Sequence, residues 1–475
     1  MNQPGPTAFF CFCAGLLTLG LSCAPSGGSD PVRLAYTVHV APESGIEVEL
    51  RVSGLGGKDP GFQLLSGLGM IQDQPGHIRE VYARTTDGLP LDLDREPETE
   101  RTVWRLRGKH KDEVVLRYRV TPYDPGISAE ASFVSRDQAL LLGYSAFLVP
   151  VELSDFLPAS IRVKVEAPPG WRVWTSWPGE DGYYRPRTTH DLWSGGILSG
   201  NFQETRLTSG AVSVTVLTEG RWSSVTGLTV ANRLHPVLRR MVDFFGAPPE
   251  GDNLDVLAVY RAAPVRDNQS RIMGISEANA FFCIATHDRF DDMREITALA
   301  AHECIHFYLG GALVARPEAP YNNAPDLVWL IEGVTEYLAY RFMLEAEGIT
   351  AAEFEDVAEA KRTLLRRKGE ESGMSLAAMA RLFDDPETYQ LVYSRGFLVA
   401  QFLNRRMDSR CGEGTFDGAL RDLFETWNFH RTHEWIDQKR VRKVFEARCP
   451  GAWEWIERYA IGGAALPGPA RPASK

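Results

Sequence analysis

The sequence predicts an α+β protein of several domains, in which an antiparallel β-sandwich precedes a mainly helical domain. Three observations predict this order. Between residues 32 and 222, short segments alternate apolar and polar residues, as strands with one buried face do. Turn signals such as Asp124-Pro125-Gly126 separate these segments. After residue 222, apolar residues recur at helical spacing instead.

The strand-like segments are short and punctuated by turns, which favours a sandwich. The clearest of them are residues 32–40, 46–52, 114–120, 161–165 and 212–216. The second domain begins with a helical segment at 226–245 and extended segments at 254–259 and 272–285. Further helical segments follow at 291–309, 326–347, 394–407, 417–427 and 439–448. The Pro- and Ala-rich residues 468–475 predict a disordered tail.

The composition excludes several classes of protein. The chain has 475 residues, of which 44% are hydrophobic and 24% charged, as is typical of chains that bury sizeable cores. Its net charge of −11, without a long basic block, argues against a nucleic-acid partner. Beyond the N-terminus, no uncharged apolar run reaches the roughly 18 residues that a membrane span needs. A polytopic membrane protein is therefore excluded.

The N-terminus has the pattern of an export signal. Residues 8–21 form an uncharged apolar run that is too short to span a membrane, and small residues precede Cys23. This pattern resembles a bacterial lipoprotein signal, so we predict a signal peptide at 1–22, a lipid on Cys23 and a flexible tether at 23–31. The alternative is an ordinary secretory signal. Either way, we expect an exported protein of the bacterial cell envelope, in the periplasm or lipid-anchored at a membrane surface.

The cysteines fit export but leave their pairing open. Cys11 and Cys13 would leave with the signal peptide, and no two cysteines have the CxxC spacing of a zinc knuckle. The four cysteines that remain after Cys23 are Cys283, Cys304, Cys411 and Cys449. Four cysteines allow three disulfide connectivities, among which the sequence does not choose.

The motif His302-Glu303-Cys304-Ile305-His306 carries the strongest chemical signal in the chain. On a helix, residues four apart lie one above the other, so both imidazoles face the same point. Two neutral ring nitrogens at that spacing suit tetrahedral zinc. The alternative, two histidines without a common ligand, is disfavoured by the apolar helix pattern that leads into the motif. We therefore predict one zinc ion per chain, held in part by His302 and His306.

Residues 329–337, WLIEGVTEY, offer the third ligand. Glu332 lies in an apolar helical segment, where a carboxylate needs a partner that offsets its desolvation. Zinc would be that partner; a glutamate on a polar helix edge is the alternative. Glu336 lies one turn further on, where it could accept a hydrogen bond from a ligand imidazole, or could be an ordinary solvated charge. With three protein ligands, one metal position would stay open, as catalysis requires.

Several motifs together resemble the glycyl aminopeptidase family of gluzincin zinc metallopeptidases. They are HECIH at 302–306, WLIEGVTEY at 329–337, Tyr-Ser-Arg-Gly at 393–396, and the closing segment 455–467. The 25 residues between the second histidine and the predicted third ligand suit this family. The resemblance implies a thermolysin-like, mainly helical gluzincin peptidase domain at 223–467, after the β-sandwich at 32–222. Members usually carry a C-terminal PDZ domain, for which too few residues remain here.

The resemblance also implies roles for individual residues. Tyr393 would donate its hydroxyl to the developing oxyanion, and Arg395 stands where these enzymes usually have lysine. Gly274 and Glu277 resemble the extended segment beside the substrate, where Glu277 would bind the free amino group of a peptide. From the motif itself, Glu303 would act as the general base on a water whose pKa the zinc lowers.

We therefore expect zinc-dependent hydrolysis of peptide bonds, with the resemblance implying an aminopeptidase that favours small N-terminal residues. Two alternatives remain at this stage: a zinc endopeptidase, and a catalytically retired surface binding protein. A structural zinc site is less favoured, because only three good ligands are found. The expected partner is a peptide substrate, with the membrane added if Cys23 is acylated.

Overall fold

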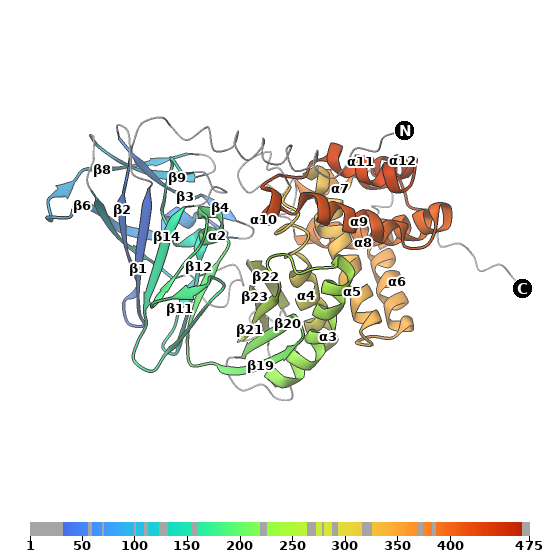
Figure 1. The fold of residues 1–475 in the computed structure, drawn as a ribbon, viewed down its shortest axis with the longest axis horizontal. Helices are drawn as coiled ribbons and strands as arrows, with labels where there is room; N and C mark the ends of the chain where they lie inside the picture. Colours follow the sequence, from blue (N-terminus) through green and yellow to red (C-terminus); the bar gives the residue numbers. More distant parts are fainter. Residues whose placement is uncertain are drawn as a thin grey trace, which may run out of the picture.

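The computed structural model describes residues 32–55, 59–68, 71–98, 101–108, 113–122, 132–153, 159–218, 226–263, 272–277, 280–286, 293–315, 325–367, 374–381 and 386–467. A β-rich N-domain and a mainly helical second domain lie side by side, in the order that the sequence predicts (Figure 1). The predicted signal peptide, Cys23, the tether and the tail at 468–475 lie outside the described residues.

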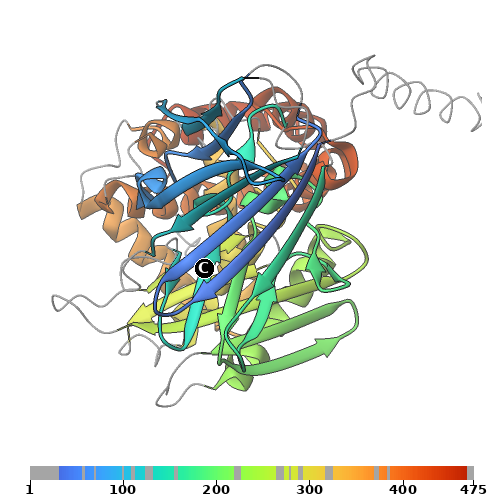
Figure 2. The same cartoon turned by 90° about the vertical axis from the view of Figure 1, so that its left-hand side faces the viewer.

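The N-domain consists of one large sheet and two smaller ones, and Figure 2 shows the large sheet in front of the other layers. The large sheet has the order β16-β17-β14-β1-β2-β10-β6-β7, and the smaller sheets are β11-β12-β18-β15 and β13-β3-β9-β8. A short hairpin joins β4 to β5. Among the described pairs of this domain, β1 and β14 run parallel, while the others are antiparallel.

The bounds of these elements are as follows. The strands of the large sheet are β1 (Arg33–Ala41), β2 (Gly45–Ser53), β6 (Ile78–Thr85), β7 (Pro90–Leu91), β10 (Val114–Val120), β14 (Ser160–Glu166), β16 (Gly179–Glu180) and β17 (Tyr183–Tyr184). Those of the smaller sheets are β3 (Gly61–Leu65), β8 (Leu93–Pro97), β9 (Arg101–Leu106), β11 (Phe133–Val134), β12 (Gln138–Leu142), β13 (Val149–Pro150), β15 (Arg172–Thr175) and β18 (Gly196–Gly200). The hairpin is β4 (Gly67–Leu68) and β5 (Ile71–Gln72), and the short helix α2 spans Thr189–Trp193.

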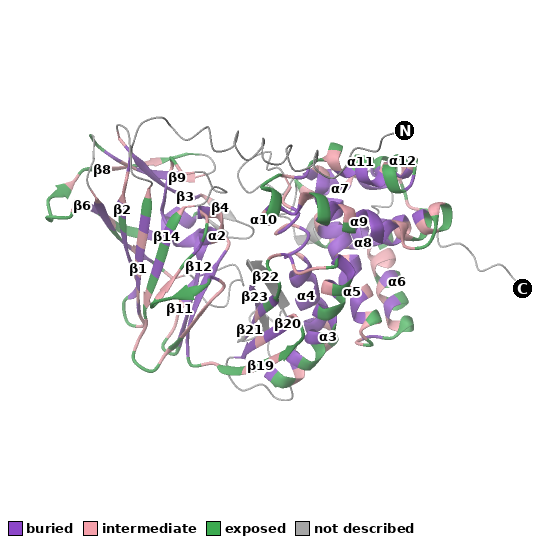
Figure 3. Ribbon diagram, in the orientation of Figure 1, coloured by how far each residue is buried: buried purple, intermediate pink, exposed green. Residues whose placement is uncertain are grey.

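Alternation of side chains places the core of the N-domain between its sheets. In β1, Leu34, Tyr36 and Val38 are buried, while the residues between them are more exposed (Figure 3). The buried phenol of Tyr36 donates a hydrogen bond to the carbonyl of Leu148 at 2.8 Å, so the polar tip of a core side chain is satisfied. The predicted sandwich is present.

The second domain begins with a five-stranded mixed sheet of order β19-β20-β21-β23-β22. Its strands are β19 (Gln203–Ser209), β20 (Val212–Thr218), β21 (Leu254–Ala263), β22 (Ile272–Glu277) and β23 (Ala280–Thr286). The sequence-based boundary at 222/223 placed β19 and β20 in the N-domain. The structure instead pairs β20 with β21, so the sheet of the second domain starts at Gln203. Alternation identifies a strand, but it does not identify the strand that pairs with it.

This sheet separates two hydrophobic cores. Leu217, Val259 and Phe282 join the core of the N-domain, while their neighbours Val216 and Phe281 join the helical core. Because successive side chains of a strand point to opposite faces, one sheet serves both domains. The two domains are therefore packed through a shared apolar layer.

Helices cover the other face of this sheet and form the rest of the domain (Figure 1). They are α3 (Gly227–Phe245), α4 (Met293–Ile305), α5 (Thr335–Glu345), α6 (Ala351–Arg367), α7 (Leu376–Ala380), α8 (Pro386–Cys411), α9 (Thr415–Trp427), α10 (Phe429–Thr432), α11 (Gln438–Arg448) and α12 (Ala452–Trp455). Two π-helical turns span Trp329–Val334 and Ile456–Ile461. None of the helices within the described ranges combines the length and hydrophobicity that a membrane crossing requires.

The helix ends follow local chemistry. The Thr226 side chain caps α3 by accepting a hydrogen bond from the backbone N–H of Thr229, and Gly246 ends this helix at φ 79°. The helix α4 ends at Ile305 rather than at the predicted residue 309, so the backbone after Ile305 forms a turn. The sequence patterns did not predict the helices α6 and α7.

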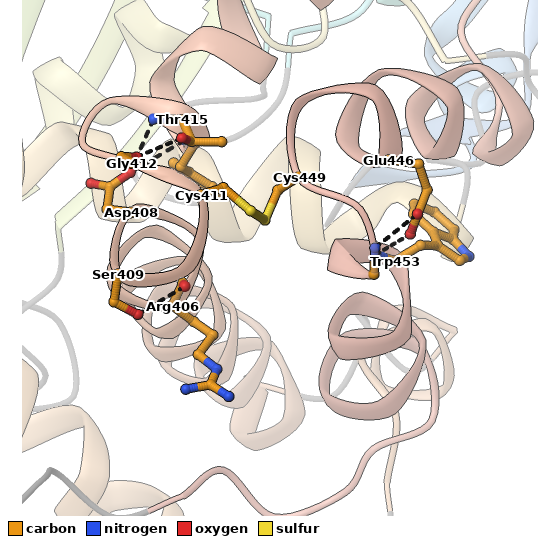
Figure 4. Close-up of a disulfide and its surroundings, with 11 residues drawn as sticks. Arg406, Asp408, Ser409, Cys411, Gly412, Thr415, Glu446, Cys449 and Trp453 are labelled. Carbon is orange, nitrogen blue, oxygen red and sulfur yellow. Dashed lines mark hydrogen bonds between the residues drawn. A yellow bond between two sulfur atoms is a disulfide. The ribbon is translucent and has the colours of Figure 1, made fainter.

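One disulfide ties the end of α8 to the end of α11. Cys411 and Cys449 are bonded, with a Cα–Cα distance of 5.6 Å (Figure 4). Cys283 and Cys304 are buried free thiols. The structure thus selects one pairing and leaves the other two cysteines reduced.

Replacing both Cys411 and Cys449 by alanine should lower the free energy of unfolding by roughly 2–4 kcal/mol, because the crosslink closes a long loop in the unfolded chain. Denaturant unfolding of the wild type and the double variant, with and without reductant, measures this change. Reductant should destabilise the wild type and leave the double variant unchanged. An unchanged wild-type curve under reductant contradicts the prediction.

Candidate metal centre

Three side chains from two segments converge on one point. His302 lies in the last turn of α4, His306 in the turn just after this helix, and Glu332 in the π-helical turn before α5. One ligand atom from each residue lies within 4.8 Å of the others. The two histidine Nε2 atoms are 3.1 Å apart, and Glu332 Oε2 lies 3.5 Å from Nε2 of His302 and 3.3 Å from that of His306. The structure therefore brings all three predicted ligands together.

The opposite nitrogen of each ring is held by an acceptor. Nδ1 of His302 lies 2.8 Å from Glu336 Oε2, and Nδ1 of His306 lies 3.0 Å from the carbonyl oxygen of Leu309. When each Nδ1–H donates to its acceptor, each Nε2 keeps a lone pair that faces the common point. This is the tautomer in which neutral imidazoles bind a metal.

The buried charges of the site favour a bound cation. Burial would raise the pKa of the Glu332 carboxyl, but the rings of His306 and His302 hold that pKa well below its usual range. Burial opposes the charged form of His302, yet the carboxylates of Glu332 and Glu336 raise its pKa to about 10. Glu332 Oε2 is buried and has no hydrogen-bond partner among the described residues. Two imidazole nitrogens and one carboxylate oxygen are a donor set for zinc, so these residues fit the metal.

A backbone contact sets the position of the π-helical turn. A Cβ atom added to Gly333 would lie 2.7 Å from the Cα of Gly396 on α8, and one added to Gly396 would lie 2.5 Å from the Cα of Gly333. No side chain fits between these segments, so the turn that carries Glu332 packs directly on α8. The ring of Tyr393, also on α8, lies with its centroid 5.3 Å from that of His302. The structure thus places Tyr393 beside the predicted ligands.

Glu303 and Cys304 lie on different sides of α4. Glu303 directly follows the ligand His302 in α4 and is buried. Cys304 is buried in the helical core, where burial raises the pKa of its thiol. It is not among the converging ligands of the described chain, so the open metal position is not filled by this thiol.

The predicted substrate segment lies on an edge strand. Gly274 and Glu277 belong to β22, which pairs with β23 at the edge of the sheet and contacts α4. The side chains of this strand lie outside the described residues, so the role of Glu277 stays a prediction. The same applies to the lipid on Cys23.

Sequence reasoning missed one charged residue near the site. Lys361 of α6 lies 2.6 Å from Glu336 Oε1, on the side of this carboxylate away from His302. No sequence signal linked the two, because they lie on different helices and α6 itself was not predicted. Arg395, by contrast, is buried away from the ligands and donates to the carbonyl oxygens of Tyr459 and Ala464.

One protein-family model matches the first of the two domains. Residues 36–194 match the Peptidase M61 N-terminal domain, which corresponds to most of the β-rich N-domain. No curated protein sequence matches the chain significantly.

Three solved structures share the fold. An aminopeptidase N family protein from Idiomarina loihiensis is 17% identical, with a TM-score of 0.77 over 91% of this chain and 77% of that chain. A variant of an M1 zinc metallopeptidase from Deinococcus radiodurans, solved with a Tyr-Ser-Ala substrate, is 16% identical, with a TM-score of 0.57 over 94% of this chain and 97% of that chain. A leukotriene A4 hydrolase from Saccharomyces cerevisiae is 16% identical, with a TM-score of 0.55 over 96% of this chain and 73% of that chain.

These comparisons confirm the predicted fold class, a β-sandwich followed by a helical peptidase-like domain. At such low identity, the likeness to solved structures shows the fold alone. The match of residues 36–194 to the Peptidase M61 N-terminal domain agrees with this fold.

Gly333→Ala should weaken zinc binding and lower the free energy of unfolding by about 1–3 kcal/mol, because its methyl group would push the π-helical turn away from Gly396. Chelator competition and thermal unfolding measure the two effects. Gly179→Ala is the matched control, since its added Cβ would meet the Tyr184 ring at an ordinary 3.4 Å. Equal zinc affinity in both variants contradicts the prediction.

Proposed function

We propose that this protein is a zinc-dependent peptide hydrolase that acts as an aminopeptidase. One observation carries the proposal: His302, His306 and Glu332 direct three ligand atoms at one buried point. Glu303, the chain neighbour of His302, would supply a base, and the ring of Tyr393 lies beside that of His302. A structural zinc site would use a fourth protein ligand, and none completes this group among the described residues.

Zinc bound by these residues would supply Lewis-acid chemistry, which polarises the peptide carbonyl and activates a water molecule. Glu303 takes the proton of the attacking water and passes it to the leaving amine. The hydroxyl of Tyr393 donates a hydrogen bond to the former carbonyl oxygen of the substrate. Negative charge develops on this oxygen as the transition state forms. Glu336 holds the His302 ring through its Nδ1.

Two findings support a peptide substrate and exopeptidase action. The structural relative from Deinococcus radiodurans was solved with a Tyr-Ser-Ala substrate, which is a short peptide. The sequence motifs resemble the glycyl aminopeptidase family, from which we take the preference for small N-terminal residues. Glu277 on the edge strand β22 would then receive the α-amino group of the substrate.

The protein is proposed to work outside the cytoplasm, at the cell envelope. The disulfide between Cys411 and Cys449 supports this location, because structural disulfides persist in oxidising compartments. A lipid on Cys23 would hold the enzyme at a membrane surface through the tether that follows.

Glu303→Gln should reduce kcat/KM for peptide hydrolysis by about 10²–10⁴-fold while zinc content stays at one per chain, since the variant loses the base but keeps the ligands. Metal analysis and hydrolysis of an alanine-terminated peptide measure the two quantities. Glu332→Gln is the contrasting variant, which should lose zinc as well as activity. A zinc-loaded Glu303→Gln variant with full activity contradicts the assignment.

Acetylation of the substrate's N-terminus should abolish cleavage, because an aminopeptidase needs the free amino group. Matched acetylated and free peptides with N-terminal glycine, alanine or leucine, followed by mass spectrometry, provide the measurement. Equal cleavage of both forms identifies an endopeptidase instead. Absence of cleavage across all peptides, with zinc bound, favours the retired binding protein.

A further inference from the structure

The carboxylate of Glu336 connects His302 to a lysine on another helix. Its Oε2 lies 2.8 Å from Nδ1 of His302, and its Oε1 lies 2.6 Å from Nζ of Lys361. Each oxygen of this carboxylate therefore has one charged or polar partner. The lysine comes from α6, which packs against α5 and α8.

The lysine is enclosed together with its partner. The side chains of Lys361 and Glu336 are 13% and 14% exposed, so neither charge is well hydrated. The ammonium also lies 5.6 Å from the ring centroid of Tyr340 and 5.3 Å from that of Phe397, within the range of cation–π attraction. These contacts leave the ammonium few other positions. Surface lysines, in contrast, move freely and orient little.

The charge of Lys361 opposes a local excess of negative charge. Glu332 and Glu336 contact the two histidine rings, and Glu303 follows His302 in the chain. Lys361 is the one lysine or arginine that forms an ion pair with any of the three within the described ranges. Burial opposes ionisation of Glu336, yet Lys361 and His302 lower its pKa to about 2. Without the lysine, Oε1 of Glu336 would be a poorly hydrated anion without a partner, and the carboxylate would turn toward solvent.

We propose that Lys361 is a positioning residue of the metal centre: it fixes the carboxylate of Glu336, which in turn orients His302 so that its Nε2 faces the metal. This inference rests on the proposed zinc site. It extends that site from Glu336, which accepts the hydrogen bond of His302, to Lys361, which pairs with Glu336. Lys361 itself touches neither the ligand atoms nor the substrate. Its effect is on how tightly and in what geometry the metal is held.

The rival explanation is that Lys361 only fastens α6 to α5. The chain offers a matched control on α5, the helix that carries Glu336. Arg341 of α5 pairs with Asp417 of α9 through two contacts of 2.6 and 2.7 Å, and its side chain is 21% exposed. This pair also joins two helices, but it does not contact a predicted ligand. Loss of either cation should destabilise the fold, whereas only loss of Lys361 should affect the metal.

The experiment compares full-length Lys361→Met, Arg341→Met and the wild type. Zinc affinity is measured by competition with a chromophoric chelator, ligand geometry by the absorption spectrum of the cobalt-substituted protein, and stability by thermal unfolding without metal. Lys361→Met should bind zinc about 10–100-fold more weakly and alter the cobalt spectrum. Arg341→Met should keep wild-type zinc affinity despite lower stability. If Lys361→Met does not fold, Lys361→Gln takes its place.

A double-variant cycle tests the route through Glu336. Because Lys361 is proposed to act only through this carboxylate, Lys361→Met should change zinc affinity by less than about twofold in a Glu336→Gln background. Lys361→Arg should retain more affinity than Lys361→Met, since it keeps the charge. Wild-type affinity in Lys361→Met, an equal loss in Arg341→Met, or full additivity in the cycle would each overturn the inference.

These outcomes separate the inference from the proposed function. Zinc binding and hydrolysis by the wild type, combined with wild-type affinity in Lys361→Met, overturn the inference alone. Zinc binding without hydrolysis overturns the proposed function, while the affinity comparison still decides the role of Lys361. A wild type that binds no zinc overturns both.

Discussion

A buried carboxylate must be compensated, and the centre of the second domain is organised around two of them. Glu332 and Glu336 lie one helical turn apart, and both are largely enclosed by apolar helices. The histidine rings face one carboxylate, and a histidine and Lys361 face the other. Because Glu303, Glu332 and Glu336 are accompanied by one lysine, further positive charge, on the histidine rings or on a metal ion, is needed to balance the cluster. The proposed affinity of the site for a metal ion thus follows from the burial of these charged side chains.

Packing keeps this cluster in one geometry. The ligands, their acceptors and Tyr393 come from segments that are far apart in the chain, so their relative positions depend on how helices meet. The direct backbone contact of Gly333 with Gly396 fixes the spacing between the π-helical turn and α8. Such irregular turns often accompany functional sites, since they re-aim a side chain without ending the helix. A site held in this way is preorganised for its ligand.

Local sequence patterns were sufficient to identify the three candidate ligands, which lie in two short segments of the chain. The spacing of His302 and His306, and the apolar surroundings of Glu332, predicted the residues that the structure brings together. Long-range pairings were beyond such reasoning. Tertiary contacts do not produce a periodic pattern in the sequence. They determine the ion pair of Lys361, the disulfide partner of Cys411 and the pairing of β20 with β21. The order of the domains was predictable, but their boundary was not, because that boundary runs through a shared sheet.

This shared sheet has a consequence for how the molecule holds together. A Cβ atom added to Gly196 of the N-domain would meet the Phe282 ring at 3.4 Å, so the two domains are in close apolar contact. Separating them would expose one complete face of the five-stranded sheet to water. Limited proteolysis between the halves should therefore leave an associated complex rather than two soluble fragments. The sandwich is in this sense part of the protein's cooperative folding unit, and not a separable domain.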